Sequence, residues 1–293
     1  MKKERRIIDR IYIFVVGICI SVIAFSILFL LFWGLLNSFK SRSEFLFDKF
    51  GLPSSFNFEN YLKAISKMEL ERLQPSGVRL KFNFWGYVQN SLLYAVGCTL
   101  INVYLTSMMA YLCARYKKFF MARFIVNLVI VTMLIPLVGT MPATVKVLSQ
   151  LNLFDSLEGV YFMSFNFLGM NFLIFYGIYS ALPGEYAEAA FIDGASHWYV
   201  MTRIMMPLVR TTTSVLLVIV FVRYWNDYQT PLVYWYSHPT VAVGLQIYVS
   251  DPLNSAFGEK MAADILVALP MIAVFLCFKN KMLGSMTVGG LKG

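Results

Sequence analysis

The sequence predicts an all-α membrane protein, a single helical bundle that crosses the bilayer six times. The chain of 293 residues is 58% hydrophobic and only 14% charged. Soluble domains carry about 25% charged residues, so a soluble fold is not expected. A helix that spans a membrane needs about 20 predominantly apolar residues, and stretches of that kind follow one another along the chain.

The six predicted spans differ in how uniformly apolar they are. The stretches 11–36 and 82–114 contain no charged residue, which makes them the strongest candidates. The first is too long for the apolar core of a secretory signal, about 7–15 residues, so it is interpreted as a retained span. The other spans are predicted at 124–147, 159–182, 211–236 and 261–279.

Lys and Arg residues predict which short loops face the cytoplasm, because such residues accumulate on that side. They occur in the N-terminal segment, in the 115–123 loop, in the 183–210 loop and in the 280–293 tail. The loops 148–158 and 237–258 contain none. Both termini are therefore predicted to be cytoplasmic.

The segment 37–81 is predicted to be an external insertion between the first two spans. It contains eight basic and five acidic residues, and its length and mixed charge make it a weaker topology signal than the short loops. A short helix is expected over 61–73, because Pro75, Ser76 and Gly77 follow it as a turn. The net charge of +9 is divided among separate loops, so nucleic-acid binding is not expected.

Four prolines are expected to kink the predicted spans. They are Pro136 and Pro142 in the third span, Pro231 in the fifth and Pro270 in the sixth. A proline inside a membrane helix frees a backbone carbonyl, which neighbouring helices or a wet cavity must satisfy. Such kinks suit a moving pore, and rigid kinks in a static bundle are the alternative.

Polar side chains within the spans are expected to face the bundle interior rather than lipid. Hydrogen bonding between helices is the favoured role, and lining of a solute path by a subset is the alternative. Arg223 and Asp227 lie four residues apart on one predicted helix face, so a structural ion pair is favoured over a gating role. The uncharged members of this set are Gln89, Asn90, Asn102, Asn127, Asn166 and Asn171.

The cytoplasmic loop at 183–210 carries the clearest functional signal. Glu185 and Glu188 suit the positive end of a helix that starts after the fourth span. Gly194 is predicted to end this helix in the left-handed conformation. Ser196 is predicted to cap a second helix that runs to Met206 and stops before Pro207.

The small alanine side chains of this loop would let another protein approach closely. Two short helices at an angle, with exposed aromatic rings, form a compact plug that fits a groove. An amphipathic hairpin that lies on the bilayer surface is the alternative, and composition alone does not separate the two.

A fixed spacing of residues connects this loop to a known family. Glu-Ala-Ala is followed by Asp-Gly-Ala, which begins three residues after the second alanine, and a proline lies twelve residues after the last alanine. The residues of this pattern are Glu188, Ala189, Ala190, Asp193, Gly194, Ala195 and Pro207. The pattern resembles the EAA loop of ABC importer permeases, which implies that these residues form coupling helices seated in a cleft of an ATPase subunit.

The resemblance extends over nearly the whole chain and points to the carbohydrate branch, where it is similar to the smaller permease of a maltose-type heterodimer. The matching segments are Asn90-Ser91-Leu92, Trp225-Asn226-Asp227, Pro231-Leu232 and the ending Met286 to Gly293. That ending resembles a tail that reaches the ATPase dimer. The implied contacts there are Gly289, Gly290, Lys292 and Gly293.

The resemblance implies a six-helix type I importer permease with a MetI-like fold in the bacterial inner membrane. The implied partners are a second related permease, two ABC ATPase subunits, an external solute-binding protein, membrane lipid, and a sugar or oligosaccharide as solute. The chain contains no G-x-x-x-x-G-K-[ST] segment, so ATP and Mg²⁺ are expected on the ATPase subunits, with no cofactor in this chain.

Other functions are weighed against this one. A permease for a non-sugar solute is the alternative within the family. An ion-coupled secondary transporter would need a coupling-ion site and usually repeated halves; only Arg223 and Asp227 could serve, and no repeat is visible. A membrane enzyme is disfavoured, because His197 and His238 fall on opposite sides of the predicted membrane. No catalytic residue or metal site is predicted.

A solute path is expected along several of the spans. Aromatic rings can stack on sugar rings, although aromatic residues in membrane helices also serve packing and interfacial belts. The candidates are Asn90, Asn171, Tyr176, Trp225, Asn226, Asp227 and Tyr228.

Overall fold

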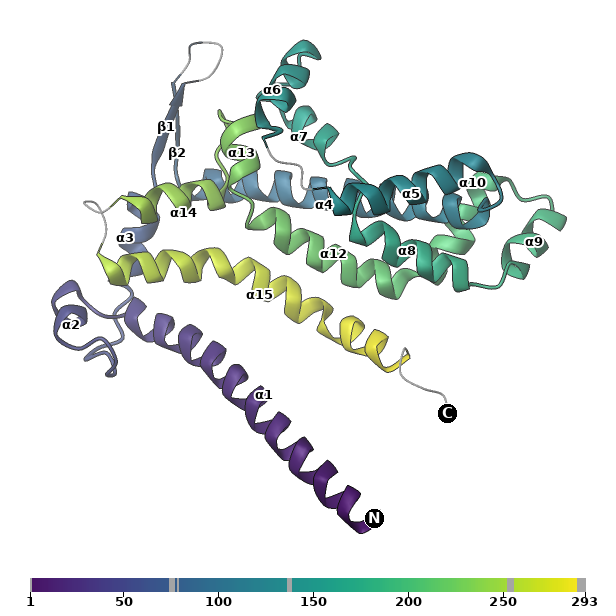
Figure 1. Cartoon of the computed structure of the whole chain (residues 1–293). Coiled ribbons are helices and arrows are strands. Elements are labelled where there is room, and N and C mark those ends of the chain that lie inside the picture. The colour runs from purple at the N-terminus through teal and green to yellow at the C-terminus, as the bar shows by residue number, and fades with distance from the viewer. Residues whose placement is uncertain (1, 74–76, 78, 136–138, 252–255, 289–293) are drawn as a thin grey trace. The chain divides into compact units, whose positions relative to one another are not determined.

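The computed structural model describes residues 2–73, 77, 79–135, 139–251 and 256–288, with side chains from residue 12 to residue 280. The described chain is helical apart from one hairpin (Figure 1). It divides into two compact units, which are described separately. One consists of residues 1–68 and 247–267, and the other of residues 69–246 and 268–293.

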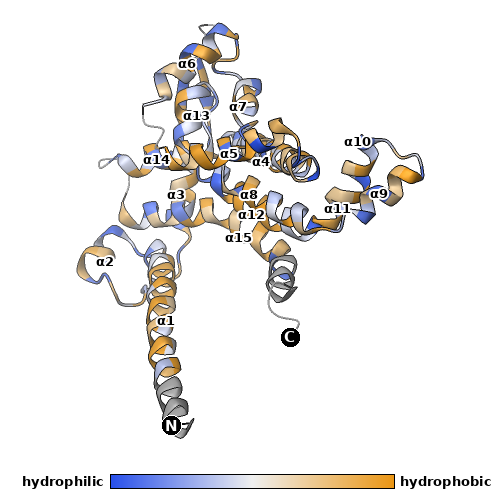
Figure 2. Cartoon of the chain, turned by 45° about the vertical axis from the view of Figure 1, so that its right-hand side comes forward, coloured by the Kyte–Doolittle hydropathy of each residue, from blue (hydrophilic) through white to orange (hydrophobic). Residues whose placement is uncertain are grey.

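The first unit contains the long helix α1 (Lys2–Ser38). Its stretch Tyr12–Ser38 has 27 residues, enough to cross a bilayer, and an 18-residue window within it has a mean hydropathy of 3.0. Its large apolar side chains are mostly exposed, and Figure 2 shows hydrophobic residues along the described part of the helix. A helix that is apolar on all sides is expected to face lipid.

The segment after α1 is held by a small set of buried polar contacts. The Asn60 side chain donates hydrogen bonds to the carbonyls of Ser38 and Lys40, both at 2.8 Å, so it satisfies groups that the end of α1 leaves open. Gly258 packs so closely that a Cβ there would lie 2.5 Å from the Lys40 carbonyl oxygen. The remaining helices with residues in this unit are α2 (Arg42–Phe47), α3 (Glu59–Lys67), α14 (Val241–Ser250) and α15 (Phe257–Val288).

The prediction of one helix over 61–73 is wrong beyond Lys67, where α3 ends. The strand β1 (Leu70–Leu73) pairs with β2 (Arg79–Phe82) in an antiparallel hairpin that places Glu71 opposite Lys81. Opposite charges across the strands favour this pairing, and Lys81 Nζ also lies 2.5 Å from a Glu69 carboxylate oxygen.

The second unit is a bundle in which α4 (Phe84–Arg115) packs against α8 (Met170–Ala181) and α12 (Arg210–Trp225) (Figure 1). The Asn83 side chain caps α4 by accepting a hydrogen bond from the Gly86 N–H at 3.0 Å. The other helices before and after the functional loop are α5 (Phe120–Leu134), α6 (Met141–Gln150), α7 (Leu157–Met163) and α13 (Gln229–Tyr234).

The predicted spans are more broken than the sequence suggests. The third divides into α5 and α6, the fourth into α7 and α8, and the fifth into α12 and α13. Pro142 lies in the first turn of α6, so it begins a helix instead of kinking one. Pro231 lies within α13, and Pro270 lies inside α15; Pro136 is outside the described residues.

Three helices of the described chain are long and apolar enough to cross a membrane, or four if the bent pair His197–Leu208 and Arg210–Trp225 forms one span. The helices α5, α8 and α14 are apolar but shorter. The count of six spans and the orientation of the termini therefore stay predictions. The sequence interpretation missed α14, because its ten residues are too few to suggest a span.

Candidate functional site

The loop predicted to carry the function forms two helical segments joined at a glycine (Figure 1). The first is α9 (Glu185–Ile192), with Glu185 and Glu188 in its first turn, where carboxylates favour the positive end of the helix dipole. The second consists of α10 (His197–Tyr199), the π-helical turn η1 (Val200–Met205) and α11 (Met206–Leu208). Residues 185–208 are called the helical loop below.

Gly194 ends α9 in the left-handed conformation, with a φ of 82°, as predicted. Its N–H donates to the Phe191 carbonyl at 3.1 Å, and the Ala195 N–H donates to the Ala190 carbonyl at 2.9 Å. These two bonds form the Schellman motif, which favours glycine at the left-handed position. The turn therefore fixes the direction in which the second segment leaves α9.

Ser196 caps the second segment, as predicted, because its hydroxyl accepts a hydrogen bond from the Tyr199 N–H at 3.2 Å. The predicted stop before Pro207 is wrong, since Pro207 lies within α11. Proline fits the first turn of a helix, where its missing N–H is not needed. The chain then bends by 79° between His197–Leu208 and Arg210–Trp225.

The helical loop is tethered to the end of α4 by exposed contacts. Arg115 Nη1 donates to a Glu188 carboxylate oxygen at 3.4 Å, and its guanidinium carbon lies 5.9 Å from the centre of the Phe191 ring. The Tyr116 hydroxyl lies 3.0 Å from His197 Nδ1. Sequence reasoning did not find this tether, because the basic end of α4 gives no indication of a partner 73 residues away.

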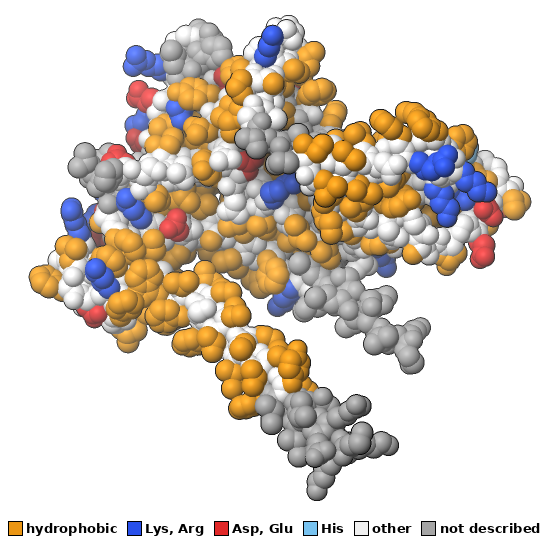
Figure 3. Space-filling model, in the orientation of Figure 1, with side chains coloured by type: hydrophobic (Ala, Val, Ile, Leu, Met, Phe, Trp, Pro, Cys, Tyr) orange, Lys and Arg blue, Asp and Glu red, His pale blue; other side chains and the backbone are white. Residues whose placement is uncertain are grey.

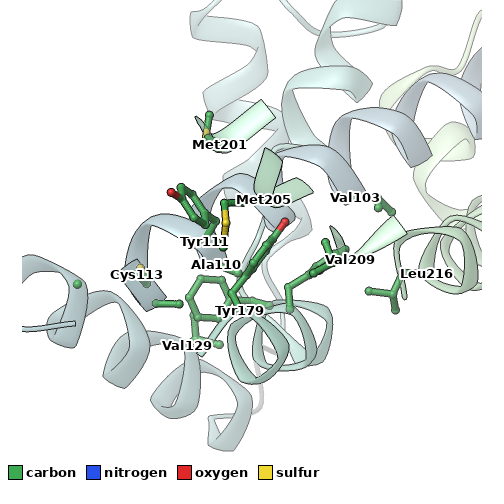
Figure 4. Close-up of a cluster of buried hydrophobic side chains, with 14 of the residues drawn as sticks. Val103, Ala110, Tyr111, Cys113, Val129, Tyr179, Met201, Met205, Val209 and Leu216 are labelled. Atoms are coloured by element: carbon green, nitrogen blue, oxygen red, sulfur yellow. The ribbon is translucent and has the colours of Figure 1, made fainter. Parts of the chain in front are cut away.

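The second segment is anchored more firmly, through buried apolar side chains. Met201 and Met205 of η1 belong to a core cluster with Ala110 and Tyr111 of α4 and Tyr179 of α8, and Figure 4 shows Met205 beside Tyr111 and Tyr179. The Tyr179 hydroxyl is also 2.8 Å from the Ser107 hydroxyl. Movement of η1 is therefore expected to be transmitted to α4 and α8.

The other face of the helical loop is open. Ile192 is 86% exposed and Trp198 is 63% exposed, which is unusual for such large apolar side chains in adjacent turns. Figure 3 shows basic and acidic side chains gathered at the end of this unit where α9 and α10 lie. The exposed members of the sequence pattern are Glu188, Ala189, Asp193, Gly194 and Pro207, while Ala190 and Ala195 are half-buried.

This surface carries the features of a docking site rather than of a reaction centre. Its acidic groups, Glu185, Glu188 and Asp193, are separated along the loop. No group of three His, Cys, Asp or Glu residues in the described part of the chain could hold a metal ion. What the loop presents is a rigid shape with exposed apolar and charged groups.

The residues predicted for a solute path lie in different environments. The buried Asn90 side chain donates to the Pro239 carbonyl at 3.0 Å, and Trp225 is fully buried against Phe221 and Ala95. Asn171 lines a cavity of about 220 Å³. The structure leaves Asn226 exposed and Tyr176, Asp227 and Tyr228 half-buried. Their role in a solute path stays a prediction.

The predicted ion pair between Arg223 and Asp227 is wrong for the described chain. The α12 helix ends at Trp225, so the two residues do not share a helix face. Asp227 instead accepts hydrogen bonds from the Tyr94 hydroxyl at 2.8 Å and from the Thr230 N–H at 3.0 Å. The tail residues Gly289, Gly290, Lys292 and Gly293 lie outside the described residues.

Comparison with known proteins identifies one family model and several permease proteins that are similar to this chain. The family model for the "Binding-protein-dependent transport system inner membrane component" matches residues 103–280. The trehalose/maltose transport system permease protein MalG of Thermococcus litoralis is 25% identical over 297 residues, which is 100% of each chain. The arabinooligosaccharides transport system permease protein AraQ of Bacillus subtilis is 28% identical over 272 residues, 91% of each chain.

Two further matches extend the comparison. The diacetylchitobiose uptake system permease protein NgcG of Streptomyces coelicolor is 25% identical over 266 residues, 88% of this chain and 82% of that protein. A chain from the crystal structure of a bacterial ABC transporter involved in the import of the acidic polysaccharide alginate has a TM-score of 0.74 and 17% sequence identity. The superposition covers 93% of this chain and 96% of the other, and it shows a shared fold.

Proposed function

The chain belongs to the family of inner membrane components of binding-protein-dependent transport systems, and from this premise we propose that it is a pore-forming subunit of an ATP-driven importer of a sugar or oligosaccharide. Members of this family are permeases and not enzymes, and separate ATPase subunits hydrolyse ATP. The absence of a phosphate-binding G-x-x-x-x-G-K-[ST] segment from the sequence agrees with this division of labour.

The carbohydrate assignment is supported by the relatives. Their names refer to trehalose and maltose, to arabinooligosaccharides and to diacetylchitobiose. These solutes share rings with many hydroxyl groups, and they differ in size and substituents. The proposal is therefore a saccharide importer; a non-sugar solute is the alternative within the family.

The proposed topology has six spans, an external insertion at 37–81 and cytoplasmic termini. It is supported by the distribution of Lys and Arg among the short loops. In this topology the helical loop faces the cytoplasm. The helices that are too short to cross the bilayer alone would act in pairs, as α5 with α6 and α7 with α8.

The helical loop is proposed to dock into a cleft of an ATPase subunit. The single observation that carries this proposal is the combination of a rigid Gly194 turn with a large exposed apolar surface around Ile192 and Trp198. Through Met201 and Met205 the loop packs on α4 and α8, so motion of the ATPase subunits would be passed to the bundle.

The proposed assembly contains a second related permease, two ATPase subunits that bind ATP and Mg²⁺, and an external solute-binding protein. The tail residues Gly289, Gly290, Lys292 and Gly293 are proposed to contact the ATPase subunits. No cofactor is proposed in this chain.

Uptake by the reconstituted assembly tests this function. The complete importer in proteoliposomes, with its binding protein outside and ATP inside, should accumulate a labelled saccharide only when both ATPase subunits are present. Uptake that persists without the ATPase subunits, driven by an ion gradient, would support a secondary transporter and contradict the proposal. The same assay with amino acids or peptides in place of saccharides tests the non-sugar alternative.

A further inference from the structure

A polar cavity of about 220 Å³ lies within the second unit. It is smaller than the pockets of about 300–1,000 Å³ that usually hold ligands of drug size, so it accommodates one small group or one ring. Its lining combines Asn102 and Thr106 of α4, Asn166 of the loop before α8, Asn171 in the first turn of α8, and Arg223 and Tyr224 of α12.

Arg223 supplies a positive charge to this cavity without a carboxylate partner among the described residues. Asp227, the nearest acidic residue along the chain, is occupied by Tyr94 and Thr230. The Arg223 side chain is exposed at the mouth of this cavity. Its guanidinium carbon lies 4.9 Å from the centre of the Tyr224 ring, and a contact of this kind orients a guanidinium.

The start of α8 adds a second positive feature to the same cavity. Gly169 precedes the 12-residue helix, and no side chain caps its first turn. Gly169, Met170 and Asn171 all line the cavity. The open N–H groups of a helix start, together with its dipole, favour an anion.

The wall behind these groups is fixed by hydrogen bonds. The Asn102 side chain donates to the Ser164 carbonyl at 3.1 Å and to the Asn166 carbonyl at 2.7 Å. The Asn166 side chain in turn accepts from the Leu168 N–H at 2.9 Å. These bonds hold residues 164–171 against α4, so the cavity is formed in advance of any ligand.

The depth of the cavity is consistent with a position inside the membrane. Arg223 lies 13 residues after Arg210, the first residue of α12, a rise of about 20 Å at 1.5 Å per residue. The α8 helix covers nearly the same distance between the cavity and the helical loop. A cation at such a depth in a bilayer about 30 Å thick is costly and usually marks a solute path.

We propose that this cavity binds the carboxylate of an acidic saccharide, a uronate unit, as the solute passes through the importer. This inference rests on the proposed function. Arginine matches a carboxylate with two parallel hydrogen bonds, and the helix start adds a favourable dipole. The side-chain amide of Asn171 in the lining can bond a sugar hydroxyl. A neutral sugar would leave the guanidinium without its counter-charge.

Binding of single sugars to the purified importer complex provides the first test. Saturation-transfer NMR should show binding of galacturonate and much weaker binding of galactose, which has the same ring without the carboxylate. In Arg223→Gln the galacturonate signal should fall by about tenfold or more, as expected for loss of hydrogen bonds to a charged group. Arg123→Gln, which removes an exposed arginine from α5, should leave the signal unchanged.

Uptake by the complete importer provides the second test, with digalacturonate and its carboxyl-reduced counterpart galactobiose as probes. Arg223→Gln should lower digalacturonate uptake and leave galactobiose uptake within about twofold. Equal losses for both sugars, or loss of the partner permease from the purified Arg223→Gln complex, would show that Arg223 pairs with a neighbouring subunit and would overturn the proposal. Import of neutral saccharides alone by the unaltered importer would overturn it as well, while the proposed function would stand. Import of no saccharide at all would overturn the proposed function.

Discussion

Gly194 is the residue on which the shape of the helical loop depends most directly. Its φ of 82° is open to glycine but costs other residues about 1–2 kcal/mol, and most for a β-branched side chain. No atom lies within 4 Å of a Cβ built there, so any effect of a substitution comes from the backbone and not from a clash inside the chain.

Replacement of Gly194 by valine is therefore expected to redirect the second segment of the loop and uncouple transport. ATP-driven uptake should fall strongly, while the amount of protein in the membrane stays normal. Gly17→Val is the matched control, because Gly17 also has free space around it but lies in α1 without a positive φ. Full uptake by the Gly194→Val importer would contradict the role given to this turn.

Glu44 provides a pH-dependent contact in the external insertion. Its carboxylate accepts hydrogen bonds from the Ser54 N–H at 2.5 Å and the Ser54 hydroxyl at 2.8 Å. The backbone hydrogen bond from Ser54 is the main cause that lowers the pKa of Glu44 below its ordinary value of 4.5. Because the folded pKa is lowered, the contact stabilises the fold above about pH 4.5 and is lost as the pH falls through the folded value.

Hydrogen exchange should reveal this loss at the Ser54 amide. Its protection factor is expected to be constant from about pH 5 to about pH 7, where the Glu44 carboxylate is charged. It should drop in more acidic solution, where the carboxylate becomes protonated. In Glu44→Gln the protection should be lower at neutral pH and independent of pH. A protection factor that increases on acidification would have the wrong sign for this mechanism.

At the scale of the element, the second segment of the helical loop depends on its cap. Ser196 accepts a hydrogen bond from the Tyr199 N–H, and loss of such a cap costs about 1 kcal/mol. Ser196→Ala is expected to increase amide exchange of α10 and η1 several-fold, and Ser196→Asp should retain most of the protection. Equal exchange in all three proteins would argue that packing alone holds the segment.

The two segments of the loop differ in how they are attached to the bundle. The Arg115–Glu188 pair has side chains that are 27% and 62% exposed, and ion pairs of that kind contribute about 0–1 kcal/mol. Met205 is 4% exposed within the core cluster, and truncation of a buried methionine costs about 2–5 kcal/mol.

Denaturation of the solubilised complex should separate these contributions. Met205→Ala is expected to lower the thermal midpoint clearly, whereas Arg115→Ala should lower it little and act mainly on the coupling of ATP hydrolysis to uptake. Met205→Leu, which keeps the volume nearly constant, should preserve stability. The opposite order of stabilities would mean that α9, and not η1, anchors the loop.

At the scale of the whole molecule, the proposed six-span topology places the 37–81 insertion outside and the helical loop in the cytoplasm. Ser55 lies exposed in the 37–81 insertion, and Ile192 lies exposed in the helical loop. In a variant without Cys19, Cys98, Cys113 and Cys277, a cysteine placed at Ser55 should react with an impermeant maleimide from outside intact cells. A cysteine placed at Ile192 should react only in inverted vesicles. Labelling of both positions from one side would refute the six-span topology.

The sequence is sufficient for the local features that depend on neighbouring residues. The Gly194 turn and the Ser196 cap follow from residue type and spacing, and the structure contains both. The hairpin at 70–82 and the helix α14 were missed, because short elements without a strong period give weak signals. The role of the predicted solute-path residues depends on neighbours that are far apart in the sequence.

By itself, the sequence determined that this protein is helical and apolar and that the loop after residue 183 bends at a glycine, because hydrophobic content and backbone preferences are properties of adjacent residues. Only the tertiary structure decided that Arg115 donates a hydrogen bond to Glu188 and that Asp227 accepts one from Tyr94. It also decided that Arg223 lines a cavity beside the start of α8. The physical reason is that each of these contacts joins different helices, and the packing of helices selects partners that no local pattern encodes.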